Sequence, residues 1–348
     1  MLGQSRTMTH ERKSIIGGVY DIGVGTSNAD DAIAFWQSCG YRVGARGSLT
    51  AAEAHALSGV NSKLTAIRML HQNATAGLIR LMVWDRPTGP GLQMAPLRTH
   101  GNRWSVHRTD NIANAFVHGE ILRRQGKPIH LVGPSYNLDL GKHESLKQPF
   151  RETIAASGDV LLFQPEAQLV AMTRMNYAVP KYGTINPECP LRLSEGCHMA
   201  IVLQGTDLKV FDFYEHVIGF KRYHTFDIGY KPGYMPSDMF ELSPDETFTE
   251  VDFDDPEAGD APAEHLPGRL RCFLFRSPRP PDDRLARAQP GHLGYSLFTA
   301  RVGDINHMHE RVSGSRASRV TKVLRDEFDS PAFSFVAPDG FAWTLIQD

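Results

Sequence analysis

Histidines at the start of apolar strands are the residues best placed to do chemistry. The run His198-Met-Ala-Ile-Val-Leu predicts a strand, and alternation along it places His198, Ala200 and Val202 on one face. An imidazole held there by a packed sheet could bind a metal ion or act as a general base. A hydrogen-bonded histidine of the core is the competing interpretation.

A second histidine and an aromatic stretch extend this candidate set. His292 precedes another predicted strand, and Tyr295 competes with it because the spacing from Tyr295 to the following aspartate equals that after His198. His224 alternates along Phe220-Lys-Arg-Tyr-His-Thr-Phe226, which could line a concave face. The sequence contains no serine nucleophile elbow, Walker loop or dinucleotide-binding fingerprint.

The elements that must position these residues form an internal repeat. Each repeat has a short strand, an Asp or Asn near its end that can cap a helix, an amphipathic helix, and then short strands rich in β-branched and aromatic residues. The strand and helix of the four copies lie within residues 19–41, 104–126, 198–220 and 293–312. The chain is therefore organised as four copies of one structural unit.

This repeat predicts an α+β fold of four βαβββ modules paired into two similar domains, because a single module cannot bury the concave face of its own sheet. Pairing neighbouring modules gives an N-terminal domain over residues 15–175, a linker over 176–195 and a C-terminal domain over 196–348. An acidic insertion over residues 228–266 is expected to be a solvated loop or a lid over the C-terminal cup.

Composition excludes several classes of protein. The 348 residues are 41% hydrophobic and 22% charged, which suits a globular chain of about two domains. The net charge of -2 gives no electrostatic case for binding nucleic acid, and no apolar run is long enough to span a membrane. The polar N-terminus and four scattered cysteines favour a reducing cytoplasm. The expected partners are a small-molecule substrate and, at most, further copies of the chain.

The order of these motifs resembles the vicinal-oxygen-chelate superfamily, which contains glyoxalases, bleomycin-resistance proteins and extradiol dioxygenases. The segments at 198–220 and 291–298 are similar to the openings of its metal-bearing modules, and 333–344 is similar to the closing strands of two-domain extradiol dioxygenases. The resemblance implies a divalent metal, Fe or Mn, held by His198, His292 and a carboxylate on the last strand. Thr344 stands at that carboxylate position.

The resemblance also implies a substrate site lined by His224, Tyr295, Phe335 and Thr344. Because a threonine hydroxyl is a poor Fe(II) ligand and Phe335 replaces the family's tyrosine, ordinary catechol cleavage is not expected. The implied function is a small-molecule enzyme of dioxygenase, lyase or isomerase type, acting on an oxygenated, aromatic substrate in the C-terminal cup, with or without a metal. The alternatives are a metal-free enzyme with His198 as general base, and a metal-free protein that sequesters a hydrophobic ligand.

Overall fold

Four modules of the predicted kind make up the chain. The computed structural model describes residues 15–137, 150–276 and 282–347. Module 1 contains β1 (Ile16–Gly25), α1 (Ala29–Ser38), β2 (Arg42–Leu49), α2 (Ala51–Ser58), β3 (Leu64–Leu70) and β4 (Leu78–Trp84). Module 2 contains β5 (Arg103–Thr109), α3 (Ile112–Arg124), β6 (His130–Asn137), β7 (Ala156–Phe163) and β8 (Gln168–Met175).

The second half of the chain repeats this order with shorter helices. Module 3 contains β9 (Leu193–Gln204), η3 (Leu208–Phe211), η4 (Phe213–Ile218), β10 (Lys221–Gly229), α4 (Met235–Met239), β11 (Thr247–Asp254), η5 (Pro262–Glu264) and β12 (Arg269–Phe275). Module 4, preceded by η6 (Leu285–Arg287), contains β13 (Gly294–Val302), α5 (Ile305–Ser313), β14 (Leu324–Arg325), β15 (Pro331–Val336) and β16 (Ala342–Gln347).

Capping side chains begin these helices as the sequence predicts. Asn28, Asn111 and Asp304 each accept hydrogen bonds from the first backbone N–H groups of α1, α3 and α5. Module 3 departs from the expected α-helix, because its helical segment is a 3₁₀ turn followed by a π turn. Phe211, Phe213, Tyr214 and Ile218 are all buried there, in a spacing that does not fit one face of an α-helix, and the wider turn brings all four inward.

The modules pair in an unexpected order. One eight-stranded sheet has the order β14-β15-β16-β13-β1-β4-β3-β2, and the other has the order β10-β11-β12-β9-β5-β8-β7-β6. Module 1 thus pairs with module 4 through β1 and β13, and module 2 pairs with module 3 through β5 and β9. The α+β fold of four modules in two similar units is confirmed. The predicted grouping of residues 15–175 and 196–348 is wrong for the sheets, because each sheet joins an early module to a late one.

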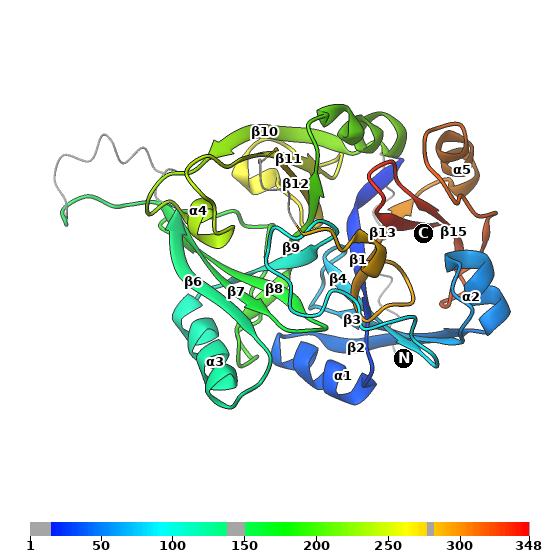
Figure 1. Cartoon of the computed structure of the whole chain (residues 1–348), viewed down its shortest axis with the longest axis horizontal. Helices are drawn as coiled ribbons and strands as arrows, with labels where there is room; N and C mark the ends of the chain where they lie inside the picture. The colour runs from blue at the N-terminus through cyan, green and yellow to red at the C-terminus, as the bar shows by residue number, and fades with distance from the viewer. Residues whose placement is uncertain (1–14, 138–149, 277–281, 348) are drawn as a thin grey trace, which may run out of the picture.

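Both sheets curl so that their two edges approach each other. In the first sheet, Gly47 on edge strand β2 lies so close to Glu327, just after β14, that a Cβ atom at Gly47 would be 1.7 Å from the Glu327 carbonyl oxygen. In the second sheet, Ser135 on edge strand β6 donates a hydrogen bond to Asp238 of α4, which follows β10. Each sheet therefore has an enclosed concave face, and Figure 1 shows the two sheets side by side with β1 and β9 near the centre.

The main core lies between the convex faces of the sheets. It joins apolar residues of both sheets to the inward faces of α1, α3, α5 and the module 3 turns, with Trp36, Phe211, Tyr214 and Met308 all buried. Helix α2 is the exception, since its Ala54 and Leu57 pack into the concave cluster of the first sheet. Among the described residues, no helix combines the length and apolar character needed to cross a membrane.

The acidic segment 228–266 is not simply a loop. Part of it is strand β11, and the short helix α4 packs against β6 at the opposite edge of the sheet (Figure 1). The side chains of Asp252 and Asp254 are buried and pair with arginines of β12. The solvated-loop interpretation is therefore wrong for β11, whose acidic residues belong to the sheet.

The crossed pairing predicts that residues 15–175 do not fold alone. Removing the rest of the chain leaves β1 without β13 and β5 without β9, so both fragments of sheet would expose an unpaired edge and half of their concave core. Thermal unfolding of this fragment should show no cooperative transition, whereas mixing it with residues 176–348 should restore one. A sharp transition for the isolated monomeric fragment would contradict the pairing.

Candidate functional site

Each curled sheet offers one concave face, and the two faces differ in what fills them. We call the concave face formed by modules 1 and 4 the 1–4 cup, and that formed by modules 2 and 3 the 2–3 cup. Strand register assigns residues to these faces, because alternate residues point to opposite sides of a sheet.

One half of the 2–3 cup is apolar and filled. The cluster there contains Trp104, Phe248, Phe273 and Phe275 from the strands and Phe240 from the segment after α4. The rings of Trp104 and Phe273 stack with their centroids 5.3 Å apart, and Phe240 packs edge-on against Phe273 at 4.9 Å. Aromatic packing of this kind closes one end of the cup and leaves the other end for chemistry.

The other half of the 2–3 cup is lined by charged side chains. His198 on β9 lies beside Arg269 on β12 in register, and Arg271 lies two residues further along the same face. On the next strand, Asp252 is opposite Arg271. Arg269 pairs with Asp254 at 2.5 Å and with Asp252 at 3.1 Å, and it is mostly buried.

Asp252 binds the Arg271 guanidinium but does not use all of its hydrogen-bond donors. Its Nε and Nη2 donate to the two Asp252 carboxylate oxygens at 2.7 and 2.8 Å, and Nε lies 3.2 Å from Glu250. Although burial opposes it, the nearby Arg271 and Arg269 hold the pKa of Asp252 well below its usual range. Among the described residues Nη1 of Arg271 has no hydrogen-bond partner, and the side chain is 24% exposed. That nitrogen can meet a ligand.

Two further carboxyl groups in this cup titrate near neutrality. Burial raises the pKa of Asp159, on β7, to about 7; Arg271 opposes that shift and Glu250 adds to it. Burial likewise raises the pKa of Glu250 to about 7, opposed by Arg271 and increased by Asp252. Asp159 belongs to module 2, whereas Glu250 and Arg271 belong to module 3, so the charges of module 3 act on Asp159 across the cup. The Oδ1 atom of Asp159 is buried without a partner among the described residues.

His198 is the neutral member of the cup. Its Nδ1 atom is 3.0 Å from the hydroxyl of Tyr182, and the residue is 5% exposed. Burial and then Arg271 hold the pKa of His198 well below its usual range. Tyr182 comes from the predicted linker, and its ring contacts the guanidinium groups of Arg174 and Arg269, each 5.3 Å from the ring centroid. The connection between modules 2 and 3 therefore forms one wall of the site.

The donor set around His198 does not fit a divalent metal ion. Arg269 lies beside His198 in register and Arg271 follows on the same face. These positive side chains repel a dication, and both already pair with Asp252. Within the described residues, the one group of three potential ligands close enough to share an ion is Asp212, Glu215 and His216, outside both cups, and there Arg222 already bridges the two carboxylates. The resemblance makes a metal plausible for the fold, but the residues at His198 do not supply its ligands.

The residues predicted to form one site are distributed over the molecule. His198 and His224 share the concave face of the 2–3 cup, and Thr344 faces the 1–4 cup. His292 lies in the segment before β13, beside Gly89 and outside both sheets. The strand that follows it belongs to the other sheet from His198, so the predicted ligand pair is not brought together.

The two predicted aromatic residues face the core. The buried Tyr295 hydroxyl is 2.9 Å from Ser105 in the core between the sheets, and Phe335 packs against Phe213 in the same core. Neither residue lines a cup.

Sequence reasoning missed Asp159, Glu250 and Arg271 as members of a site. The alternation of Glu250, Asp252 and Asp254 with apolar residues, matched by Arg269 and Arg271 on another predicted strand, was a usable signal. Asp159 carried no comparable signal, because it is a single aspartate in an otherwise apolar stretch, with no alternating charges beside it.

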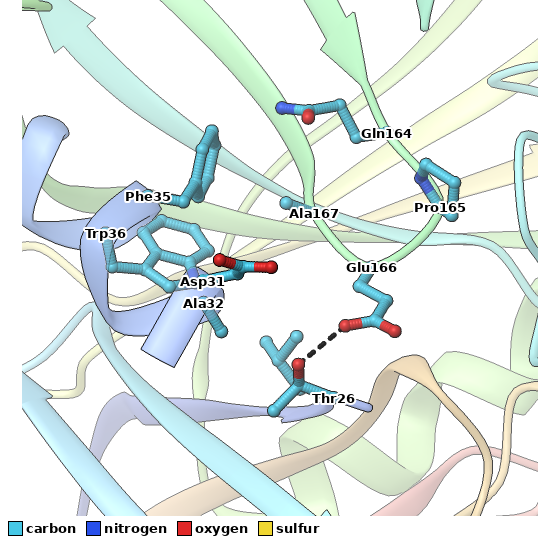
Figure 2. Close-up of a pocket in the computed structure, with 10 residues that line it drawn as sticks. Thr26, Asp31, Ala32, Phe35, Trp36, Gln164, Pro165, Glu166 and Ala167 are labelled. Atoms are coloured by element: carbon cyan, nitrogen blue, oxygen red, sulfur yellow. Dashed lines mark hydrogen bonds between the residues drawn. The ribbon is translucent and has the colours of Figure 1, made fainter. Parts of the chain in front are cut away.

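A separate cavity of about 280 Å³ lies outside both cups, between α1 and the turn that joins β7 to β8. Figure 2 shows Phe35, Trp36 and Ala32 on one side of it and the turn residues on the other. Two acids line it: Glu166 accepts hydrogen bonds from Thr26 at 2.6 Å and from Ser27 at 2.7 Å, and Asp31 accepts one from Asn28 at 2.7 Å. Because both acids already accept hydrogen bonds from nearby residues, this cavity offers less chemistry than the 2–3 cup.

Comparison with solved structures identifies the fold. Glyoxalase I from Zea mays superposes with a TM-score of 0.52 at 13% identity, covering 95% of this chain and 92% of that one. The 4-hydroxymandelate synthase from Streptomyces coelicolor matches at 11% identity over 96% and 93%, with a TM-score of 0.32. The catechol dioxygenase BphC matches at 12% identity over 96% and 87%, with a TM-score of 0.28. No protein-family model and no curated protein sequence matches the chain.

The chain therefore has the vicinal-oxygen-chelate fold, as the repeat and its motifs predicted. The similarity to the maize glyoxalase extends over both sheets, since nearly the whole of each chain is covered. At this level of identity the likeness is one of fold.

The raised pKa of Glu250 predicts how stability changes with pH. A carboxyl group with a raised pKa in the folded state stabilises the fold below its unfolded pKa, and that stabilisation is lost as the pH rises through the folded value near 7. Glu250→Gln removes this dependence. From about pH 4 to about pH 8, the free energy of unfolding of the wild type should fall by about 1–3 kcal/mol relative to the variant. Parallel curves from chemical denaturation would contradict the assignment.

Proposed function

We propose that this protein is a small-molecule enzyme that catalyses proton transfer on an oxygenated, aromatic substrate in the 2–3 cup, without a metal ion at His198. The cup differs from the predicted C-terminal one, because module 2 supplies half of it. The observation that carries the proposal is that two carboxyl groups with pKa values raised to about 7, Asp159 and Glu250, share the concave face of this cup with Arg271.

Two such groups can act as acid and base together. Burial raises the pKa of both groups to about 7, and Glu250 adds to the shift of Asp159, so near neutrality each group is present in both its acid and its carboxylate form. One member is then ready to accept a proton and the other to donate one. A pKa close to the operating pH is the condition under which general acid–base catalysis is most effective.

The reaction class that fits is isomerisation next to a carbonyl group. The ionised carboxylate takes a proton from the carbon beside the carbonyl, and the C–H electron pair forms a C=C bond while the carbonyl π electrons move to oxygen. Arg271 offers its free Nη1 to the resulting oxyanion. In an α-hydroxyketone, the hydroxyl proton of the first carbon passes to the oxyanion while the protonated carboxyl group returns a proton to the former carbonyl carbon. The carbonyl group thereby moves by one carbon, and no redox partner is required.

Aromatic side chains at the open edge of the cup support an aromatic substrate. His224 and Phe226 lie on the concave face of β10, with ring centroids 4.9 Å apart. Phe226 is 47% exposed, which is unusual for a large apolar ring. Because these rings flank Glu250 and Asp252 in register, an aromatic ring stacked on them would present its oxygen substituents to the carboxyl pair and Arg271.

The proposal predicts exchange of carbon-bound hydrogen. In D₂O with a chelator present, the wild type should catalyse deuterium incorporation beside the carbonyl of a compound in a panel of aryl hydroxyketones, followed by NMR. Asp159→Asn and Glu250→Gln should each slow this exchange by about 10²–10⁴-fold, because each removes one proton-transfer group. Glu166→Gln, in the cavity of Figure 2, should exchange at the wild-type rate.

Three results would overturn the proposal. Exchange that the chelator abolishes and Mn²⁺ restores would assign the chemistry to a metal. Loss of exchange in Glu166→Gln, with Asp159→Asn unaffected, would move the site to the other cavity. Tight binding of the aryl compounds without any exchange would favour the sequestration protein.

A further inference from the structure

The 1–4 cup contains a different arrangement of the same kinds of residue. Asp21 on β1, Arg80 on β4, Thr299 on β13 and Thr344 on β16 all face its centre, as the registers of these strands require. Thr344 is the position to which the sequence resemblance assigned a metal-binding carboxylate. The first and last strands of both modules thus converge on this point, and a guanidinium group is present there.

Arg80 has an oxygen atom near each of its guanidinium nitrogens, although its Nε and the Oδ1 atom of Asp21 make no hydrogen bond within the described residues. Its Nε lies 3.3 Å from Asp21, its Nη1 donates to Glu327 at 2.9 Å, and its Nη2 donates to the hydroxyl of Thr299. The side chain is 1% exposed. Burial opposes the charged form, but Asp21 and Glu327 raise the pKa of Arg80 above its usual value, so the guanidinium stays positive. The Arg80 guanidinium is thus surrounded by two carboxylates and a hydroxyl oxygen. A hard divalent cation binds the same kinds of oxygen ligand.

The loop that carries Glu327 lies over the cup, where Glu327 contacts Arg80. It can approach β2 because Gly47 has no side chain, as the 1.7 Å separation from a built Cβ shows. Arg68 holds the loop from inside the cup, with its guanidinium 3.9 Å from the ring centroid of Phe328 and its Nε 3.3 Å from Asp21. Apolar residues of α2 and of the strands fill the remaining concave face.

We propose that the guanidinium of Arg80 is a tethered cation that closes the 1–4 cup in place of a metal ion, leaving the chain with one working cup. The two cups hold their charges differently. In the 1–4 cup every guanidinium nitrogen of Arg80 lies beside an oxygen of Asp21, Glu327 or Thr299. In the 2–3 cup Arg271 keeps one nitrogen free of partners among the described residues.

Removing the Arg80 side chain should create a site for a free cation. Arg80→Ala leaves Asp21 and Glu327 buried without their partner, and its melting temperature should fall by on the order of 5–10 °C. Low-millimolar guanidinium ion, too dilute to denature, should raise the melting temperature of Arg80→Ala and not that of the wild type. Mn²⁺ should also stabilise Arg80→Ala and bind to it with a one-to-one EPR signature that Asp21→Asn removes. Arg325→Ala, which changes an exposed arginine of the same loop, should behave as wild type.

The wild type supplies an independent arm of the test. The wild type should bind no Mn²⁺ at Asp21. If the wild type instead binds one Mn²⁺ per chain and Asp21→Asn does not, the proposal is overturned. An Arg80→Ala variant as stable as the wild type, or one that guanidinium does not stabilise, would overturn it too. If Arg80→Ala fails to fold, Arg80→Lys should fold and be intermediate in stability, since it keeps the charge without the forked geometry. Equal loss in Arg80→Lys and Arg80→Met would show that charge is irrelevant there.

Discussion

The antiparallel pairing of first strands, β1 with β13 and β5 with β9, is the constraint on which the molecule depends. A four-stranded module has an unpaired edge and a concave face that it cannot cover, so it is stable only beside another module. Both cups are therefore composite. Arg80 pairs with Glu327, and the charge of Arg271 acts on Asp159, only because distant parts of the chain share a sheet.

Composite cups bury charge, and the two cups manage that charge in opposite ways. In the 1–4 cup, Arg80 is paired with two carboxylates and a hydroxyl group, which suits a structural role. In the 2–3 cup, the pairing of Asp252 with two arginines leaves Glu250 and Asp159 incompletely compensated. Buried carboxyl groups without a full partner have raised pKa values, and such groups concentrate at functional sites.

Local features of this fold could be predicted from the sequence, and long-range ones could not. Helix caps such as Asn28 and the four-fold repeat depend on nearby residues. The order of module pairing depends on contacts that no local pattern encodes. Tyr295 was assigned to the wrong face because the pairing of β13 with β1 shifts register between Gly23 and Val24. This irregularity turns the Tyr295 side chain into the core. Phe335 is opposite Trp343 rather than Thr344, so Phe335 and Thr344 point to opposite faces.

Nested pairing also imposes an order on synthesis. Modules 2 and 3 are adjacent in the chain, and their shared sheet is complete once β12 has left the ribosome at residue 275. Module 1 is made first, yet its partner strand β13 begins only at Gly294. During most of translation β1 therefore waits with an open edge, which is the state in which nascent chains aggregate or recruit chaperones. The closure of the 1–4 cup by Arg80 and Glu327 is accordingly among the last native contacts that a newly made chain can form.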